Sequence, residues 1–173
     1  AVPPGETGAA LAGAALEAPP GFEVAMVLEV LQMVADDVAA VEGDAAIETL
    51  SPADADEMLA LTDLTRPGPF ARRTIAMGDY FGIRAEGRLI AMAGQRLNLP
   101  RHREVSAVCT HPDHLGRGHA RRLVSEVARR ILAEGKTPFL HVVPGNESAI
   151  AVYRKLGFAP RRHLVFTVLR RLP

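Results

Sequence analysis

Apolar residues recur at helical spacing between residues 120 and 132 and predict an amphipathic helix there. The apolar positions are Ala120, Leu123, Val124, Val127, Ala128, Ile131 and Leu132. The positions between them are polar: Arg121, Arg122, Ser125, Glu126, Arg129 and Arg130. Gly135 follows where a C-terminal cap is expected. The pattern predicts one buried and one exposed face.

Alternating apolar and polar residues predict strands elsewhere in the chain. Apolar side chains fall on every second position from Phe22 to Val30, although Val24, Val27, Leu28 and Leu31 also fit a helix. Glu86-Gly87 separates two alternating stretches, 79–85 and 88–99, as in a hairpin. Further strands are predicted over 8–12, 46–50, 104–110, 138–143 and 163–169.

Capping signals predict two more helices. Ser51 and Pro52 are typical of a helix start, and we expect Met58, Leu59, Leu61 and Leu64 to supply part of its buried face. The sequence 66–69 ends that helix, and a short helix is expected over 70–77. Asn146 begins a helix with apolar residues at Ala149, Val152, Tyr153 and Leu156, and Gly157 ends it. From residue 46 the element order is β-α-(α)-β-β-β-α-β-α-β, an α/β layer with a mixed sheet.

Composition describes a soluble globular chain. It has 173 residues, 48% hydrophobic and 23% charged. No apolar run reaches the roughly 18 residues of a membrane span, so no membrane partner is expected. Residues 1–64 hold 13 acidic and no basic residues, whereas the remainder holds all 20 Lys and Arg. These bases are scattered without a nucleic-acid-reading motif, which disfavours a nucleic-acid partner.

The cysteine and histidine residues bear on whether the chain has a disulfide, a nucleophilic thiol or a metal site. Cys109 is the single cysteine, so no internal disulfide can form, and a cytoplasmic location is expected. Cys109 lies in an apolar strand and is expected to be a buried hydrophobe rather than a nucleophile. His111, His114 and His119 lack the helical spacing of a zinc site, so we expect no metal.

Residues 105–120 run from a predicted strand through a glycine-bearing turn into the long helix. Gly116 and Gly118 allow a tight turn and a close approach of a bulky anion. The helix start concentrates unpaired N–H groups and partial positive charge, and Arg117, Arg121 and Arg122 add full charges beside it. A phosphate or diphosphate is the anion that this junction, called the elbow below, suits best.

Two ordered motifs resemble the GNAT superfamily of acyl-CoA-dependent N-acyltransferases. Residues 115–120, Leu-Gly-Arg-Gly-His-Ala, match its Q/R-x-x-G-x-G/A signature except for Leu115, where Gln or Arg is usual. The motif N-x-x-A-x-x-x-Y-x-x-x-G-F is complete over 146–158. The resemblance covers residues 46–173, and the chain also resembles a poorly characterised branch of predicted acetyltransferases.

The resemblance implies a mixed, mostly antiparallel central sheet flanked by helices, with two splayed parallel strands that form the acyl-CoA cleft. Acetyl-CoA would lie between the strand that ends at Thr110 and the strand 138–143, without a metal. Its pantetheine arm would pair with the backbone of Val108, Cys109 and Thr110. Its diphosphate would contact the elbow, and Asn146 would lie near the pantetheine. The elbow residues so implied are Leu115, Gly116, Arg117, Gly118, His119, Ala120 and Arg121.

Two catalytic candidates follow. A phenol with an ordinary pKa of about 10 stays protonated at neutral pH, so Tyr153 is expected to protonate the departing thiolate. Glu104, at the start of the strand that leads to the elbow, is expected to accept a proton from the acceptor ammonium; a solvated strand-end carboxylate is the alternative. His141 alternates with Phe139 and Val143, which leaves open an acceptor-facing or a satisfied core histidine.

The expected function is direct acetyl transfer from acetyl-CoA to a primary amine of a small molecule or peptide. A CoA-binding sensor or interaction module without turnover is the alternative. We divide the chain into an extension, residues 1–45, and an acetyltransferase domain, residues 46–173. Two roles are open for the extension: extra strands on the sheet, or a homodimer contact. The chain begins with Ala1 rather than Met, so a preceding targeting segment is also left open.

Overall fold

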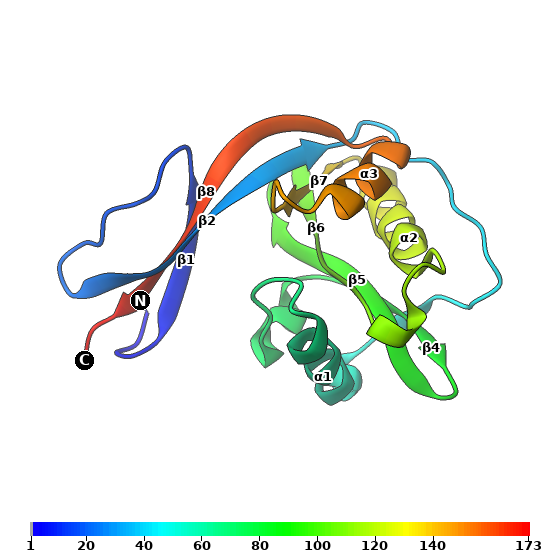
Figure 1. Ribbon diagram of the computed structural model, residues 1–173, viewed down its shortest axis with the longest axis horizontal. Coiled ribbons are helices and arrows are strands. Elements are labelled where there is room, and N and C mark those ends of the chain that lie inside the picture. Colours follow the sequence, from blue (N-terminus) through cyan, green and yellow to red (C-terminus); the bar gives the residue numbers. More distant parts are fainter. Residues whose placement is uncertain (1) are drawn as a thin grey trace. The chain divides into compact units, whose positions relative to one another are not determined.

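The computed structural model describes residues 2–173, and Ala1, the first residue of the predicted extension, lies outside them. From residue 46 on, strands and helices follow one another in the order that the sequence predicts (Figure 1). The strands are β1 Thr7–Ala12, β2 Phe22–Val34, β3 Glu48–Leu50, β4 Tyr80–Ala85, β5 Arg88–Asn98, β6 His102–Thr110, β7 Thr137–Val142 and β8 Ala159–Arg171. The α-helices are α1 Ala55–Thr65, α2 His119–Ala133 and α3 Glu147–Lys155, and the 3-10 helices are η1 Pro52–Asp54, η2 Arg72–Met77 and η3 Pro112–His114.

The strands pair in the order β1-β8-β2-β7-β6-β5-β4-β3. β1 and β8 are antiparallel, as are β3 with β4, β4 with β5, and β5 with β6. β6 and β7 are parallel. The predicted mixed, mostly antiparallel sheet is therefore confirmed.

The chain forms two compact units. The first unit contains the residues up to Met33, residues 141–150 and residues 160–173. In it β1 pairs with β8 from Thr7 opposite Arg170 to Ala12 opposite Val165. The second unit contains residues 34–140 and 151–159, and so includes the elbow. The predicted boundary at residue 45 stays a prediction.

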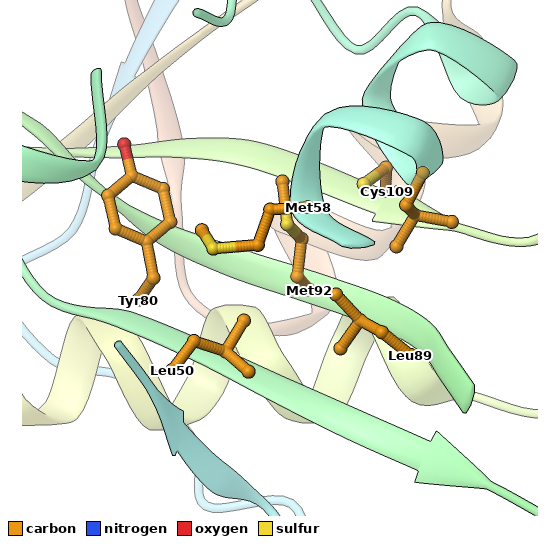
Figure 2. Packing of buried hydrophobic residues seen from close by; sticks show 7 residues of the cluster. Leu50, Met58, Tyr80, Leu89, Met92 and Cys109 are labelled. Atoms are coloured by element: carbon orange, nitrogen blue, oxygen red, sulfur yellow. The ribbon is translucent and has the colours of Figure 1, made fainter. Parts of the chain in front are cut away.

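In the second unit α1 and α2 cover opposite faces of the sheet. Tyr80 packs in a core cluster with Met58 of α1. The neighbouring Phe81 points the other way, where the guanidinium of Arg130 from α2 lies 4.4 Å from its ring centre. Figure 2 shows the first cluster between α1 and the strands, with Met58, Tyr80, Met92 and Cys109 directed into it.

Element boundaries follow the local signals closely. Ser51 begins η1 with a reciprocal cap: its side chain accepts from Ala53, and the Asp54 carboxylate accepts from the Ser51 backbone. The predicted helix over 70–77 is the 3-10 helix η2. Arg66 ends α1 in the left-handed conformation.

Some boundaries and faces differ from the sequence prediction. β3 is shorter than 46–50, because only three of its residues pair with β4. β2 and β8 both extend beyond the predicted ranges. Leu64 was expected on the buried face of α1 but is 54% exposed.

Ser125 was assigned to the polar face of α2, and that assignment is wrong. The side chain is buried, and its hydroxyl donates to the carbonyl of Ala39 at 2.7 Å. Residues 36–45, called the connector below, contain no helix or strand and lie against this part of α2. Arg122 of the same helix also donates to the connector, at Gly43 O. The connector therefore covers a face of α2 that the periodicity of the sequence predicts to be exposed.

Candidate active site

The elbow has the backbone conformation that anion binding requires. Gly116 and Gly118 have φ angles of 75° and 79°, in the left-handed region that other residues rarely adopt. Gly118 is the N-cap residue of α2, and no side chain caps this helix start. A Cβ at either glycine would meet no atom within 4 Å. The first amides of α2 are therefore reachable by a bulky ligand.

A pocket lies at this helix start. Its volume is about 450 Å³, and residues of the elbow form one wall while residues of the connector form the other. The connector supplies Val41, Glu42, Gly43, Asp44 and Ala45, and the elbow and helix supply Arg117, Gly118, His119, Arg121 and Arg122. The walls thus combine backbone donors with three guanidinium groups.

Unpartnered buried polar atoms gather in the same segment. Among the described residues, five buried side-chain nitrogen or oxygen atoms have no hydrogen-bond partner. Four of them lie between residues 110 and 122, and the fifth is Gln95 Nε2. The four are Thr110 Oγ1, His114 Nδ1, His119 Nδ1 and Arg122 Nε. Because such groups cost free energy when unpaired, this concentration fits a site that a polar ligand completes.

Arginine, and not His119, supplies the positive side-chain charge at the elbow. Burial, then the charges of His114, Arg117 and Arg122, lower the pKa of His119. Its imidazole is therefore neutral at physiological pH. Leu115, which replaces the usual polar residue, is 63% exposed.

β6 and β7 pair at their starts. The parallel register runs from His102 opposite Thr137 to Glu104 opposite Phe139, and β6 continues to Thr110. On its other side β6 pairs with β5 as far as Thr110, with a register shift where Ala107 adopts a φ of 53°. Such a bulge bends a strand, and a bend in β6 fits the predicted separation of β6 from β7.

Cys109 belongs to the core and not to the chemistry. Its side chain is 6% exposed, and burial raises the pKa of the thiol to about 11. The expectation of a buried small hydrophobe is confirmed. Only its backbone is available for the predicted pairing with a ligand, as is the backbone of the half-buried Val108.

Glu104 is held in a buried ion pair that the sequence did not predict. The side chain is 1% exposed, so the alternative of a solvated strand-end carboxylate is wrong. Arg96 of β5 donates to both of its oxygens, at 2.9 and 2.8 Å. Burial opposes the charge of Arg96, but the hydrogen bonds and charge of Glu104 outweigh it and raise the pKa of Arg96. No local motif marks Arg96; only the pairing of β5 with β6 brings it to Glu104.

Tyr153 and Asn146 are positioned by α3. Asn146 precedes the helix, and its Oδ1 accepts from the Ala149 amide at 3.2 Å, which confirms the predicted cap. Tyr153 is 8% exposed, with the ring of Phe158 6.2 Å away edge-on. Burial raises the pKa of its phenol to about 12. The hydroxyl therefore keeps its proton throughout the neutral range.

Within residues 2–173, no group of three or more His, Cys, Asp or Glu side chains is arranged to hold a metal ion. None of the helices in that part of the chain is long and apolar enough to cross a bilayer.

Comparisons with known proteins agree with this geometry. Residues 80–167 match the family model described as FR47-like protein. A solved GNAT-family structure from Novosphingobium aromaticivorans is 39% identical with a TM-score of 0.89, covering 98% of this chain and 76% of that one. The chain belongs to the GNAT superfamily. It has the GNAT fold.

Two curated mycobacterial proteins are also similar. The N-alpha-acetyltransferase RimI of Mycobacterium tuberculosis is 38% identical over 82 residues, which are 46% of this chain and 51% of that protein. An uncharacterised protein of Mycobacterium leprae is 35% identical over 123 residues, 65% of this chain and 34% of that protein. The chain thus spans about half and about a third of the length of these two relatives.

Proposed function

We propose that the protein transfers an acetyl group from acetyl-CoA directly to a primary amine. The observation that carries this proposal is the elbow: two left-handed glycines, a helix start without a side-chain cap, and four unpartnered buried polar atoms within residues 110–122. All of these features suit a diphosphate-bearing ligand.

Coenzyme A would be held largely by main chain. The amides of residues 116–121 would bind the diphosphate, with Arg117 and Arg121 adding charge. Because these contacts are to backbone, Leu115 in place of a polar residue removes one side-chain contact and leaves the rest. The backbone of residues 108–110 would pair with the pantetheine arm, and Asn146 would lie near it.

Tyr153 is the proposed general acid. Acetyl-CoA supplies an acyl thioester, whose carbon forms a bond to the amine nitrogen as the carbon–sulfur bond breaks. Tyr153 would donate its phenolic proton to the departing thiolate. A phenol that burial keeps protonated is suited to this step.

Glu104 is the proposed proton acceptor. Arg96 holds the carboxylate in place by donating one hydrogen bond to each of its oxygens. The carboxylate would accept a proton from the acceptor ammonium, directly or through a water. Removal of this proton gives the neutral amine that attacks the thioester.

The acceptor class is a primary amine. RimI is, by its name, an N-alpha-acetyltransferase. That similarity supports an α-amine as one acceptor to assay, beside small-molecule amines.

Tyr153→Phe tests the proposal. The substitution keeps the buried ring, so CoA affinity should stay within about twofold while the turnover rate falls roughly 10²- to 10⁴-fold. Tyr80→Phe is the matched control, because Tyr80 is the other tyrosine and is also buried. Thiol release from acetyl-CoA over an amine panel measures turnover, and calorimetry measures CoA affinity. Wild-type protein that binds CoA but acetylates no amine would instead support the binding-module alternative.

A further inference from the structure

The pocket at the start of α2 has two walls of opposite charge. The wall formed by the elbow and the helix carries Arg117, Arg121 and Arg122, and the connector wall carries Glu42 and Asp44. Across residues 2–173, none of these five side chains takes part in an ion pair. The connector precedes residue 46, where the resemblance to the GNAT superfamily begins, so that resemblance gives the connector no role.

The connector is anchored on both sides of the pocket. Before the pocket, the Ala39 amide donates to the carbonyl of Leu156 at 3.2 Å, and the Ala39 carbonyl accepts from Ser125 at 2.7 Å. After the pocket, the chain enters β3, which pairs with β4. Contacts within the chain therefore set the position of the wall that residues 41–45 form.

Arg122 holds the middle of this wall. Its Nη2 donates to the carbonyl of Gly43 at 2.7 Å. The two residues are so close that a Cβ on Gly43 would lie 2.7 Å from Arg122 Nε. The φ angle of Gly43 lies outside the left-handed region, so this close approach, and not the backbone conformation, is what favours glycine here. One guanidinium group thus ties the connector to α2.

The space between the walls suits a ligand larger than a phosphate. Its volume of about 450 Å³ is within the range of small-molecule and cofactor sites. His119 also lines it, and the Nδ1 atom of His119 is buried without a partner. A diphosphate alone would satisfy the arginines but leave two carboxylates facing its negative charge. A nucleotide carries phosphates at one end and hydroxyl and amino donors at the other, and carboxylates accept from such donors.

We infer that the connector binds the adenosine end of coenzyme A, with Glu42 and Asp44 as acceptors for its ribose hydroxyl and adenine amino groups. This inference rests on the proposed function and adds a second wall to the same site. Arg122 is a positioning residue, because it holds the connector opposite the elbow. The nucleotide is thus recognised through a segment that lies outside both sequence motifs.

Amide chemical shifts in wild-type protein test the wall directly. The first two probes are coenzyme A and 4′-phosphopantetheine, which has the same arm but no adenosine. Coenzyme A should shift the amides of residues 41–45, and 4′-phosphopantetheine should leave them in place. Adenosine 3′,5′-bisphosphate, the nucleotide fragment, should shift them as well, whereas inorganic diphosphate should shift the elbow amides only. Silent amides at 41–45 with coenzyme A, or equal shifts there with inorganic diphosphate, would overturn the inference.

Calorimetry on variants measures what the two carboxylates contribute to affinity. Glu42→Ala combined with Asp44→Ala should weaken coenzyme A binding roughly tenfold and leave the affinity for 4′-phosphopantetheine within about twofold. Asp36→Ala is the matched control and should change neither, because Asp36 is an exposed acid of the same connector outside the pocket. Carboxylates that only repel the phosphates would raise affinity when removed. Unchanged or tighter coenzyme A binding in the double variant would therefore contradict the inference.

Gly43→Ala tests the positioning role of Arg122. The new Cβ must displace the guanidinium group, so coenzyme A affinity should fall about fivefold, and by more than the affinity for 4′-phosphopantetheine. Gly13→Ala is the control, since a Cβ there meets no atom within 4 Å and its φ angle is also outside the left-handed region. Wild-type affinity in Gly43→Ala, or an equal loss for both ligands, would contradict the role assigned to Arg122.

The outcomes separate this inference from the proposed function. Coenzyme A that binds and supports acetylation without shifting residues 41–45 would overturn the inference alone. Absence of coenzyme A binding would overturn the proposed function, while adenosine 3′,5′-bisphosphate would still report on the pocket. If the double variant does not fold, the wild-type titration decides, because it needs no substitution.

Discussion

Glu104 and Tyr153 are both buried, but the structure supports each of them differently. Glu104 has a charged partner, Arg96, whose two hydrogen bonds fix its orientation. Tyr153 is surrounded by hydrophobic core, and its pKa rises through desolvation alone. A fixed carboxylate and a phenol that keeps its proton are the two forms that proton acceptance and proton donation require.

A double-variant experiment separates a catalytic from a structural role for Glu104. Glu104→Gln leaves the buried Arg96 without its counter-charge, so stability should fall by about 3–5 kcal/mol. Adding Arg96→Gln should restore most of that loss. If Glu104 accepts the proton, the double variant regains stability but not turnover. Recovery of wild-type turnover would show that the ion pair is structural only. Urea unfolding and thiol release provide the two measurements.

The raised pKa of Tyr153 predicts a dependence of stability on alkaline pH. The folded phenol titrates near pH 12 and the unfolded phenol near pH 10. The contribution of Tyr153 to the free energy of unfolding is therefore full below pH 10. It is lost as the pH rises toward 12, by about 1 kcal/mol at pH 11. Tyr153→Phe should flatten the decline measured by urea unfolding between pH 9 and 11. An unchanged decline would contradict the burial assigned to this hydroxyl.

At the scale of elements, sequence periodicity predicted most of the secondary structure. The long helix, the β4–β5 hairpin and the two capped helix starts appear where the local signals place them. What periodicity missed depends on distant segments. Ser125 is buried because the connector covers α2, and Arg96 reaches Glu104 only because β5 pairs with β6. Neither contact leaves a local signal in the sequence.

The candidate site was predictable only where its residues carry local signals in the sequence. Glycines, caps and motif residues are local, so the elbow, Asn146 and Tyr153 could be named from the sequence. The roles assigned to them stay predictions. The connector wall of the pocket was not predictable, because Gly43 and Arg122 are 79 residues apart in the chain.

The two ends of α2 provide a matched test of the elbow. Gly118 and Gly135 have φ angles of 79° and 71°, and a Cβ at either would meet no atom within 4 Å. Alanine at either position should therefore cost a similar amount of stability, about 1–2 kcal/mol. Gly118→Ala should also weaken CoA binding by at least tenfold, and Gly135→Ala should not. Equal affinities by calorimetry would remove the elbow from the binding site.

At the scale of the whole molecule, ion pairs with later arginines partly offset the acidic charge of the first 64 residues. Arg84 pairs with Glu48, Asp54 and Glu57, all from the acidic first 64 residues. Arg170 pairs with Glu23 in the same way within the first unit. The acidic start of the chain is thus partly neutralised by later arginines.

The central claim is that backbone amides of the elbow hold the diphosphate of coenzyme A. Its most direct test is amide chemical shifts in wild-type protein titrated with coenzyme A and, in parallel, with pantetheine, which lacks the diphosphate. We predict that the amides of residues 116–121 shift strongly with coenzyme A and little with pantetheine. If coenzyme A produces no shift at these amides, or if its only shifts occur elsewhere, the account is contradicted.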